Sequence, residues 1–276
     1  MSKPLVSVIV PTYNSTQFLE ACLKSITDQT YKNIELIVVD NNSKDDTKEI
    51  AKRYTDKVYN RGPERSAQRN YGVSQSAGDY VLIIDSDMEL GAKVVEQCVE
   101  QFTQHAELLG LVIPEESFGE GFWAQCKRLE RSFYIGVPWM EAARAFRRKA
   151  YLDVGGYNED MVSGEDWDLS QRVERLGNIG RIIEPIRHNE GELSLVKTLK
   201  KKYYYAQEFA NYTAVNSNAD RVASQTSVAR RYSLFLRRPL MLLHNPVIGA
   251  GMLFMKTCEF AYGGLGYLKV KEYSRI

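Results

Sequence analysis

The sequence has few of the residues that build disulfide scaffolds or metal clusters. It contains four cysteines and three histidines in 276 residues, and no two cysteines form a C-x-x-C pair. The cysteines lie far apart and show no metal-ligand spacing, so we expect separate thiols in a reducing compartment. We expect these thiols to be buried as small apolar side chains.

An excess of charge of one sign is also absent. Thirty-six Lys and Arg residues oppose thirty-five Asp and Glu residues, which leaves a formal net charge of +1. A strong global positive field, of the kind that attracts nucleic acid, is therefore missing. We expect no nucleic-acid partner.

Long hydrophobic runs are missing as well. The apolar start, residues 5–10, is too short for a signal peptide and is followed at once by Pro11. The apolar segment 239–255 is broken by His, Asn and Pro at 244–246, and its longest clean run is about half of the roughly 20 residues that a spanning helix needs. We expect a cytoplasmic protein.

Short β-branched apolar runs alternate with helical patterns in the first part of the chain. The runs that are typical of strands buried on both faces are 5–10, 34–39 and 80–84. Apolar residues at helical spacing or polar helix-like stretches occupy 18–26, 45–54 and 65–77. The alternation predicts an α/β domain with a mostly parallel sheet.

Polar residues follow each of the three predicted strands. They are PTYN at 11–14, DNNS at 40–43 and DSD at 85–87. Ligands bind beyond the carboxyl ends of parallel strands, so adjacent strands would bring these three clusters to one edge of the sheet. Two carboxylates, Asp85 and Asp87, would be costly to bury there unless a cation meets them.

The pattern becomes less regular after residue 90. We predict a helix near 92–103, a strand near 109–113 and a helix near 119–134, whereas 140–146 suits either a strand or a helix. Apolar spacing within 163–177 predicts an amphipathic helix that ends at a glycine.

The composition changes near residue 192. Between 197 and 238 two acidic residues, Glu208 and Asp220, face a set of basic ones: Lys197, Lys200, Lys201, Lys202, Arg221, Arg230, Arg231, Arg237 and Arg238. Basic and tyrosine-rich sequence beside the apolar segment 239–255 favours binding at a membrane surface; a helical layer that covers the sheet is the alternative. We divide the chain into a domain at 1–191 and a helical extension at 192–276.

Four motifs in this order resemble those of family 2 glycosyltransferases with the GT-A fold: VSVIVPTYN, ELIVVDNNSKDDT, ERSAQRNYGVSQSAGDYVLIIDSD and GGYNEDMVSGEDWDLSQRV. The resemblance covers roughly residues 4–190. It implies a GT-A (Rossmann-like) mixed, mostly parallel sheet flanked by helices, and an enzyme that uses a nucleotide diphosphate sugar as donor.

The resemblance implies a divalent metal, Mn²⁺ or Mg²⁺, at the D-x-D motif. Asp87 would be a metal ligand, Asp85 would contact the ribose or the metal shell, and His188 would complete the coordination. Hard oxygen ligands suit such a cation, which neutralises a diphosphate leaving group. The alternatives are a carboxylate pair that starts a turn and a histidine that is exposed or hydrogen-bonded in the core.

The same resemblance places Pro11, Tyr13 and Asp40 in the nucleotide-base pocket, with Asn41 beside it. Tyr13 offers a stacking face, and Asp40 offers a hydrogen-bond acceptor. Family members often have Asp at the position of Asn41, so the base remains open. The alternatives are a helix cap at Asn14 and an Asx turn at Asp40.

Arg69 matches a family arginine near the nucleotide and its phosphates, and a forked guanidinium suits that task. The alternative is a solvated charge on a helix. In MEAAR, Glu141 and Arg144 are candidate acceptor-side residues or a pair on a helix surface.

The segment GEDWD resembles the E-D motif of the family. This implies that Asp166 is the general base on the acceptor hydroxyl and that Glu165 positions the acceptor or a loop, with Asp168 a weaker candidate base. An alkyl hydroxyl needs a carboxylate to accept its proton as the bond to C1 forms. The alternative is a capping box formed by Ser163 and Asp166.

Taken together, the resemblance implies an inverting, metal-dependent transfer of a single sugar to a glycan or lipid-linked acceptor. The Q-x-x-R-W motif of processive members is absent, and no dedicated nucleophile for a double displacement is evident. We expect the protein at the inner face of the membrane, bound through 197–268.

Two other classes of protein remain open. One is a non-catalytic nucleotide-sugar-binding scaffold of a membrane glycan-assembly complex. The other is a nucleotidyltransferase, which needs a Gly-rich triphosphate loop that PTYNST does not provide.

Overall fold

The computed structural model describes residues 3–215 and 219–273, and it describes side chains outside 207–221 and 270–276. The side chains of Glu208, Asp220 and Arg221 therefore lie outside the described residues. The chain forms two compact units: the first is 1–115, 142–159 and 165–189, and the second is 116–141, 160–164 and 190–276. The units interleave along the sequence, and the division at 191–192 stays a prediction.

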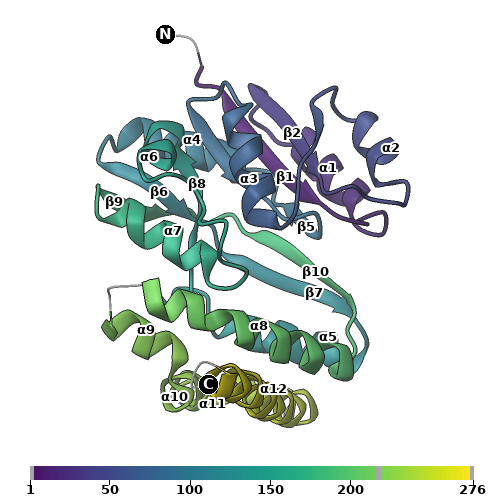
Figure 1. Ribbon diagram of the computed structural model, residues 1–276, viewed down its shortest axis with the longest axis vertical. Helices are drawn as coiled ribbons and strands as arrows, with labels where there is room; N and C mark the ends of the chain where they lie inside the picture. Colours follow the sequence, from purple (N-terminus) through teal and green to yellow (C-terminus); the bar gives the residue numbers. More distant parts are fainter. Residues whose placement is uncertain (1–2, 216–218, 274–276) are drawn as a thin grey trace. The chain divides into compact units, whose positions relative to one another are not determined.

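A seven-stranded sheet forms the centre of the first unit, in the order β3-β2-β1-β4-β8-β6-β9 (Figure 1). Its strands are β1 (Val6–Thr12), β2 (Ile34–Asp40), β3 (Val58–Asn60), β4 (Tyr80–Ile83), β6 (Leu108–Val112), β8 (Ala143–Arg147) and β9 (Asn178–Arg181). β8 runs antiparallel to β4 and β6, and the other pairs are parallel. The predicted mixed, mostly parallel sheet is confirmed.

Helices flank this sheet as predicted. They are α1 (Leu19–Thr27), α2 (Thr47–Lys52), α3 (Arg65–Ser74), α4 (Val94–Gln104), α6 (Arg148–Asp153) and α7 (Glu165–Glu174). The stretch 140–146, which suits either structure, contributes a strand, β8, whose pairing with β4 explains its apolar content.

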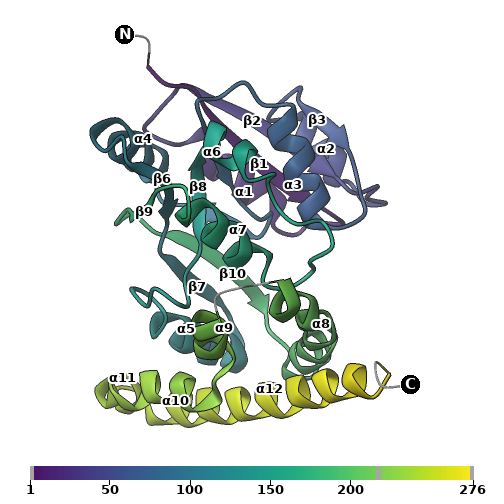
Figure 2. The same cartoon turned by 60° about the vertical axis from the view of Figure 1, so that its left-hand side comes forward.

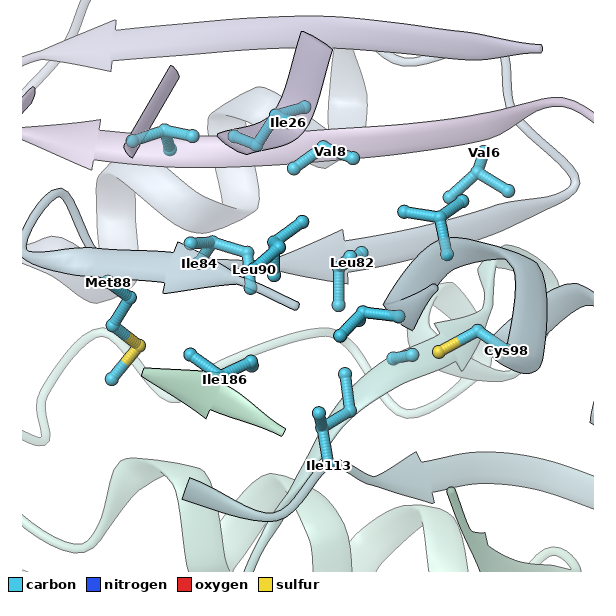
Figure 3. Close-up of a cluster of buried hydrophobic side chains, with 14 of the residues drawn as sticks. Val6, Val8, Ile26, Leu82, Ile84, Met88, Leu90, Cys98, Ile113 and Ile186 are labelled. Atoms are coloured by element: carbon cyan, nitrogen blue, oxygen red, sulfur yellow. The ribbon is translucent and has the colours of Figure 1, made fainter. Parts of the chain in front are cut away.

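The sheet has a core on each face. Val8 and Leu82 belong to one cluster, with Ile26 of α1 and Cys98 of α4 (Figure 3). Ile9 belongs to the cluster on the other face. Successive strand side chains point to opposite faces, so a strand covered on both faces is apolar throughout.

A short ribbon lies beside the D-x-D segment in the first unit. β5 (Met88–Leu90) pairs antiparallel with the start of β10 (Ile186–Glu192), and His188 is opposite Met88. β10 continues into the second unit, where its neighbour is β7 (Glu115–Glu120).

The second unit is mainly helical. Its helices are α5 (Gly121–Ser132), α8 (Leu195–Val215), α9 (Ala219–Thr226), α10 (Val228–Leu236), α11 (Pro239–Leu243) and α12 (Pro246–Tyr273). The long helix α12 packs on α8 and α5 (Figure 2). Cys126, Phe133, Phe235, Met252 and Met255 form its core. Within residues 3–215 and 219–273, no helix combines the length and apolar content needed to cross a bilayer.

Candidate active site

Three strand ends meet at one edge of the sheet. β1 lies between β2 and β4 in parallel register, with Ile9 opposite both Ile37 and Ile83. The hydroxyl of Thr12 donates to Asp40 Oδ1 at 3.0 Å, which joins the ends of β1 and β2. The predicted convergence of the polar clusters is confirmed.

Asp40 stabilises the loop that follows β2. Its side chain is fully buried, and Oδ1 accepts from the hydroxyls of Thr12 and Ser43 at 3.0 and 2.5 Å. Oδ2 accepts from the Ser43 amide at 2.8 Å and pairs with Lys48 at 3.5 Å. Asp40 therefore makes the side-chain contacts of a turn, as the alternative predicts. A contact of Asp40 with a base stays a prediction.

The other residues assigned to the base pocket lie around this loop. Pro11 is buried in β1, whereas the ring of Tyr13 is 61% exposed and open to stacking. The amide of Asn41 donates to the Thr12 carbonyl at 2.9 Å. Asn14 does not cap a helix, since α1 begins at Leu19. Contacts of these residues with a nucleotide stay predictions.

Arg69 connects the D-x-D motif with the E-D motif. Its side chain is fully buried in α3; Nη2 donates to Asp85 Oδ1 at 2.6 Å, and Nη1 donates to Asp166 Oδ1 at 3.2 Å. A third carboxylate, Glu165, lies 3.4 Å from Nη1. The alternative of a solvated helix charge is wrong, because α7 brings its first-turn acids onto α3.

Asp85 is held between two arginines. Arg144 Nη1 lies 3.6 Å from Oδ2, while Arg144 Nε donates to Glu115 at 2.5 Å. Burial raises the pKa of Asp85, but the attraction of Arg69 and Arg144 outweighs it and holds this pKa well below its usual range. Arg144 belongs to β8, so the alternative of a helix-surface pair is wrong. A role of Asp85 at the ribose or metal stays a prediction.

Asp166 has the geometry of a held but accessible carboxylate. Its side chain is 29% exposed, and Oδ1 accepts from both Arg69 and the hydroxyl of Tyr157, the latter at 2.9 Å. No described residue hydrogen-bonds Oδ2, so this oxygen is available to a substrate. α7 begins at Glu165, which places Ser163 before the cap position, and the capping-box alternative is wrong.

The neighbouring acids of α7 are engaged elsewhere. Glu165 is almost fully buried and pairs with Arg65 at 2.8 Å. Burial and, after it, the nearby charge of Asp166 raise the pKa of Glu165. Asp168 pairs with Arg172 at 2.6 Å one turn along the helix. Asp166 is therefore the acid of this motif that is best placed to meet an acceptor.

Tyr157 is a site residue that the sequence patterns did not single out. Asn70 holds its backbone on both sides: Nδ2 donates to the Tyr157 carbonyl at 2.9 Å, and Oδ1 accepts from the Tyr157 amide at 2.8 Å. The guanidinium of Arg69 lies 4.8 Å from the ring centroid. The GGYNED motif contains this tyrosine, but nothing in its spacing reveals a contact with Asp166.

Asp87 and His188 form the candidate metal site. The ribbon of β5 and β10 brings His188 Nε2 to 3.3 Å from Asp87 Oδ2. Asp87 Oδ1 is buried and has no hydrogen-bond partner among the described residues. An orphaned carboxylate oxygen beside an imidazole fits a divalent cation of the Mn²⁺ type. In the described part of the chain no group of three or more acidic, histidine or cysteine side chains is placed so that it could hold a metal ion by itself.

The chain matches the model of glycosyl transferase family 2 over residues 7–157, more than half of its length. Glycosyltransferase GlyA of Streptococcus pneumoniae is 26% identical over 215 residues, 75% of this chain but 29% of that protein. The GalNAc(5)-diNAcBac-PP-undecaprenol beta-1,3-glucosyltransferase of Campylobacter jejuni is 24% identical over 96% of this chain and 82% of its own length.

Solved structures share the fold. The mannosyltransferase PcManGT from Pyrobaculum calidifontis, in complex with GDP-Man and Mn²⁺, superposes with a TM-score of 0.63 at 15% identity and covers 97% of this chain and 88% of its own. TarS of S. aureus in complex with UDP-GlcNAc superposes with a TM-score of 0.53 at 18% identity, covering 98% and 91%. At these identities the likeness shows the fold alone. From the family match and the named relatives, we conclude that the chain belongs to glycosyl transferase family 2 and is a glycosyltransferase of the GT-A fold.

Proposed function

We propose that the chain is an inverting, metal-dependent glycosyltransferase that moves a single sugar from a nucleotide diphosphate sugar to a hydroxyl of a glycan or lipid-linked acceptor. The observation that carries the proposal is the position of Arg69, which holds the D-x-D residue Asp85 and the candidate base Asp166 at once. Donor and base motifs thereby share one rigid support, as a reaction between two substrates requires.

The side chains of the chain suggest how the transfer proceeds. Oδ2 of Asp166 accepts the proton of the acceptor hydroxyl while the hydroxyl oxygen attacks C1 of the sugar. The bond from C1 to the diphosphate breaks, and the nucleotide diphosphate leaves. Arg69 and Tyr157 hold Oδ1 and keep the carboxylate oriented. With one accessible carboxylate as base and no covalent intermediate, the configuration at C1 inverts.

The proposed metal would be held by Asp87 and His188. A divalent cation supplies charge neutralisation for the diphosphate leaving group when it is bound. The orphaned Oδ1 of Asp87 supports this assignment. Tyr13 would stack on the base of the nucleotide, with Pro11, Asp40 and Asn41 around the base. Arg69 would lie near the nucleotide and its phosphates, and Asp85 would contact the ribose or the metal shell.

The acceptor and the membrane complete the proposal. A relative that aligns with nearly the whole chain is named for a substrate linked to undecaprenol through a diphosphate, which supports a lipid-linked acceptor. We propose that the protein is peripheral at the inner face of the membrane and contacts it through 197–268. The basic, exposed Lys197, Lys200 and Lys201 suit anionic lipid.

The first test is calorimetric binding of uridine, guanosine and thymidine diphosphate sugars with and without Mn²⁺. One donor should bind in a metal-dependent manner to the wild type, and Asp87→Ala should lose that binding. If no donor binds, the site does not use nucleotide sugars and the proposed function fails. If a donor binds but is neither transferred to a soluble acceptor nor slowly hydrolysed, the scaffold alternative is favoured instead.

A further inference from the structure

The long helix α12 buries charged side chains and exposes large apolar ones. Lys256 and Glu259 are both at most 4% exposed, whereas Val247 and Phe254 are 69% and 56% exposed. A water-exposed helix normally buries an apolar stripe and turns its charges outward. Here two charged residues lie inside the second unit together with Met252 and Met255, and further apolar side chains lie outside.

The inward charges form a closed network. Lys127 and Lys256 each pair with both Glu130 and Glu259, at distances between 2.6 and 3.1 Å. The two lysines therefore neutralise the two glutamates on the side of α12 that faces α5. In Figures 1 and 2 the helices α5 and α8 lie on the same side of α12. The ion pairs therefore lie on the side of α12 that faces the rest of the second unit.

The outer face of α12 is a continuous stripe without charge. Its exposed residues recur every three or four positions, with one adjacent pair at 264 and 265: Val247, Ala250, Phe254, Thr257, Ala261, Gly264, Leu265 and Leu268. At a rise of about 1.5 Å per residue this stripe is about 31 Å long. The hydroxyl of Thr257 is hydrogen-bonded within the unit, to the Leu253 carbonyl and to Tyr232. No side chain of this face therefore needs water.

Apolar residues of α11 extend the stripe, and cations flank it. Leu240 and Leu243 are 80% and 64% exposed. Arg237 and Arg238 are exposed directly before α11, and Lys269 is exposed at the other end. Among the exposed positions of 236–269 that the structure describes, the side chains with full charge are these three cations. An apolar strip with cations at both ends matches the interior and the headgroups of an anionic bilayer surface.

We propose that the protein binds anionic membranes through the outer face of α11 and α12, with α12 lying along the surface. This rests on the proposed function and narrows its membrane contact from 197–268 to the outer face of α11 and α12, so that the basic start of α8 is not needed for binding. Contiguous exposed apolar surface of this extent marks an interaction site. The cations favour anionic lipid over a second copy of the same positively flanked stripe.

The test is co-sedimentation of the full chain with vesicles of phosphatidylcholine, with and without phosphatidylglycerol. We expect the wild type to bind the anionic vesicles and to be released by salt. Phe254→Glu with Leu265→Glu, both at exposed positions, should lower the affinity at least tenfold. A matched control is Ile183→Glu with Leu176→Glu, exposed apolar residues of the first unit, which should bind like the wild type.

A second pair of substitutions tests the charges. Arg237→Gln with Arg238→Gln should lower the affinity for anionic vesicles about tenfold and leave that for neutral vesicles unchanged. Equal binding by the α12 variant and its control overturns the proposal, as does absence of binding by the wild type. A dimeric wild type that Phe254→Glu with Leu265→Glu turns into a monomer, without vesicle binding, assigns the face to a second copy and also overturns it.

Vesicle binding and donor binding fail independently. A wild type that binds vesicles but no nucleotide sugar would refute the proposed function and leave the α12 contact intact. A wild type that binds a donor, loses it in Asp87→Ala and ignores vesicles would do the reverse. Both measurements use the same preparation of the full chain.

Discussion

The hydroxyl of Tyr157 donates a hydrogen bond to Oδ1 of Asp166 at 2.9 Å. The two residues are nine positions apart, on either side of a segment that belongs to the other unit, and Asn70 holds the tyrosine by its backbone. The contact leaves Oδ2 of Asp166 free of the described side chains. An accessible carboxylate with one oxygen held is prepared to accept a proton from a bound hydroxyl.

Replacing Tyr157 by Phe should lower kcat about tenfold and leave KM for the donor unchanged. The ring and its contact with Arg69 remain, so the variant removes one hydrogen bond to a charged group. Steady-state kinetics on the two substrates measure this split. A matched control is Tyr31→Phe, whose hydroxyl donates to the Pro4 carbonyl and takes no part in the site. A change confined to KM would contradict a positioning role.

Asp166→Asn should lower kcat by a hundredfold or more, since general-base catalysis typically contributes about 10²–10⁴. Glu165→Gln should lower it less than about tenfold, because that side chain is buried against Arg65. Single-turnover assays with the identified donor, together with circular dichroism to confirm folding, provide the comparison. Equal losses in the two variants would show that Asp166 is not the specific base.

His188→Ala should weaken metal-dependent donor binding at least tenfold, because it removes a proposed ligand of the metal and leaves the nucleotide pocket unchanged. Mn²⁺ titration followed by paramagnetic relaxation of water measures the metal directly. The control is His105→Ala, whose ring lies on the surface beside Glu107. Unchanged Mn²⁺ affinity in His188→Ala would remove this residue from the metal site.

Asp85→Asn should destabilise the folded protein by about 3 kcal/mol at pH 7, because it leaves buried arginine charge unpaired. The folded pKa of Asp85 is depressed, so its contribution is present above the unfolded value near 3.9 and is lost as the pH falls further. The gap in melting temperature between variant and wild type should therefore narrow in acid. Calorimetry between neutral pH and the acid limit of folding measures it.

The control for Asp85 is Asp28→Asn. Asp28 pairs with Lys24 on the surface of α1, where both side chains are more than half exposed. An exposed pair contributes at most about 1 kcal/mol. If both substitutions lower the free energy of unfolding equally, the interactions of Asp85 with Arg69 and Arg144 contribute no more than an exposed ion pair.

Lys202 should make stability rise with pH in the alkaline range. Glu259 raises its pKa, but burial and the charges of Lys127 and Lys256 outweigh this and lower the pKa of Lys202 to about 8. Above that value the folded chain releases a proton that the unfolded chain keeps until about pH 10.5, so unfolding becomes less favourable. Lys202→Met should abolish this rise, and Lys200→Met, at an exposed position, should retain it. Denaturant titrations at pH 7.5 and 9.5 measure the difference.

Local sequence patterns predicted β1, β2 and β4, the main helices of the first unit and the edge of the sheet where the site lies. The stretch 36–39 is apolar throughout because both faces of a central strand are covered, and this is a local pattern. The polar residues after each run then meet, since parallel neighbours end at the same edge. Asp87 follows a strand in this way, whereas Asp166 is indicated by the resemblance of GEDWD to the E-D motif of the family.

The contacts of these residues depend on how segments far apart in the sequence pack together. The junction at Arg69 depends on α3, β4 and α7 packing together, and the support of Asp85 by Arg144 requires the antiparallel insertion of β8. Likewise, α12 can bury Lys256 and Glu259 because they pair with Lys127 and Glu130 of α5 inside the second unit. Periodicity within one segment records which side chains share a face, whereas contacts between segments far apart in sequence arise from the packing of the whole chain.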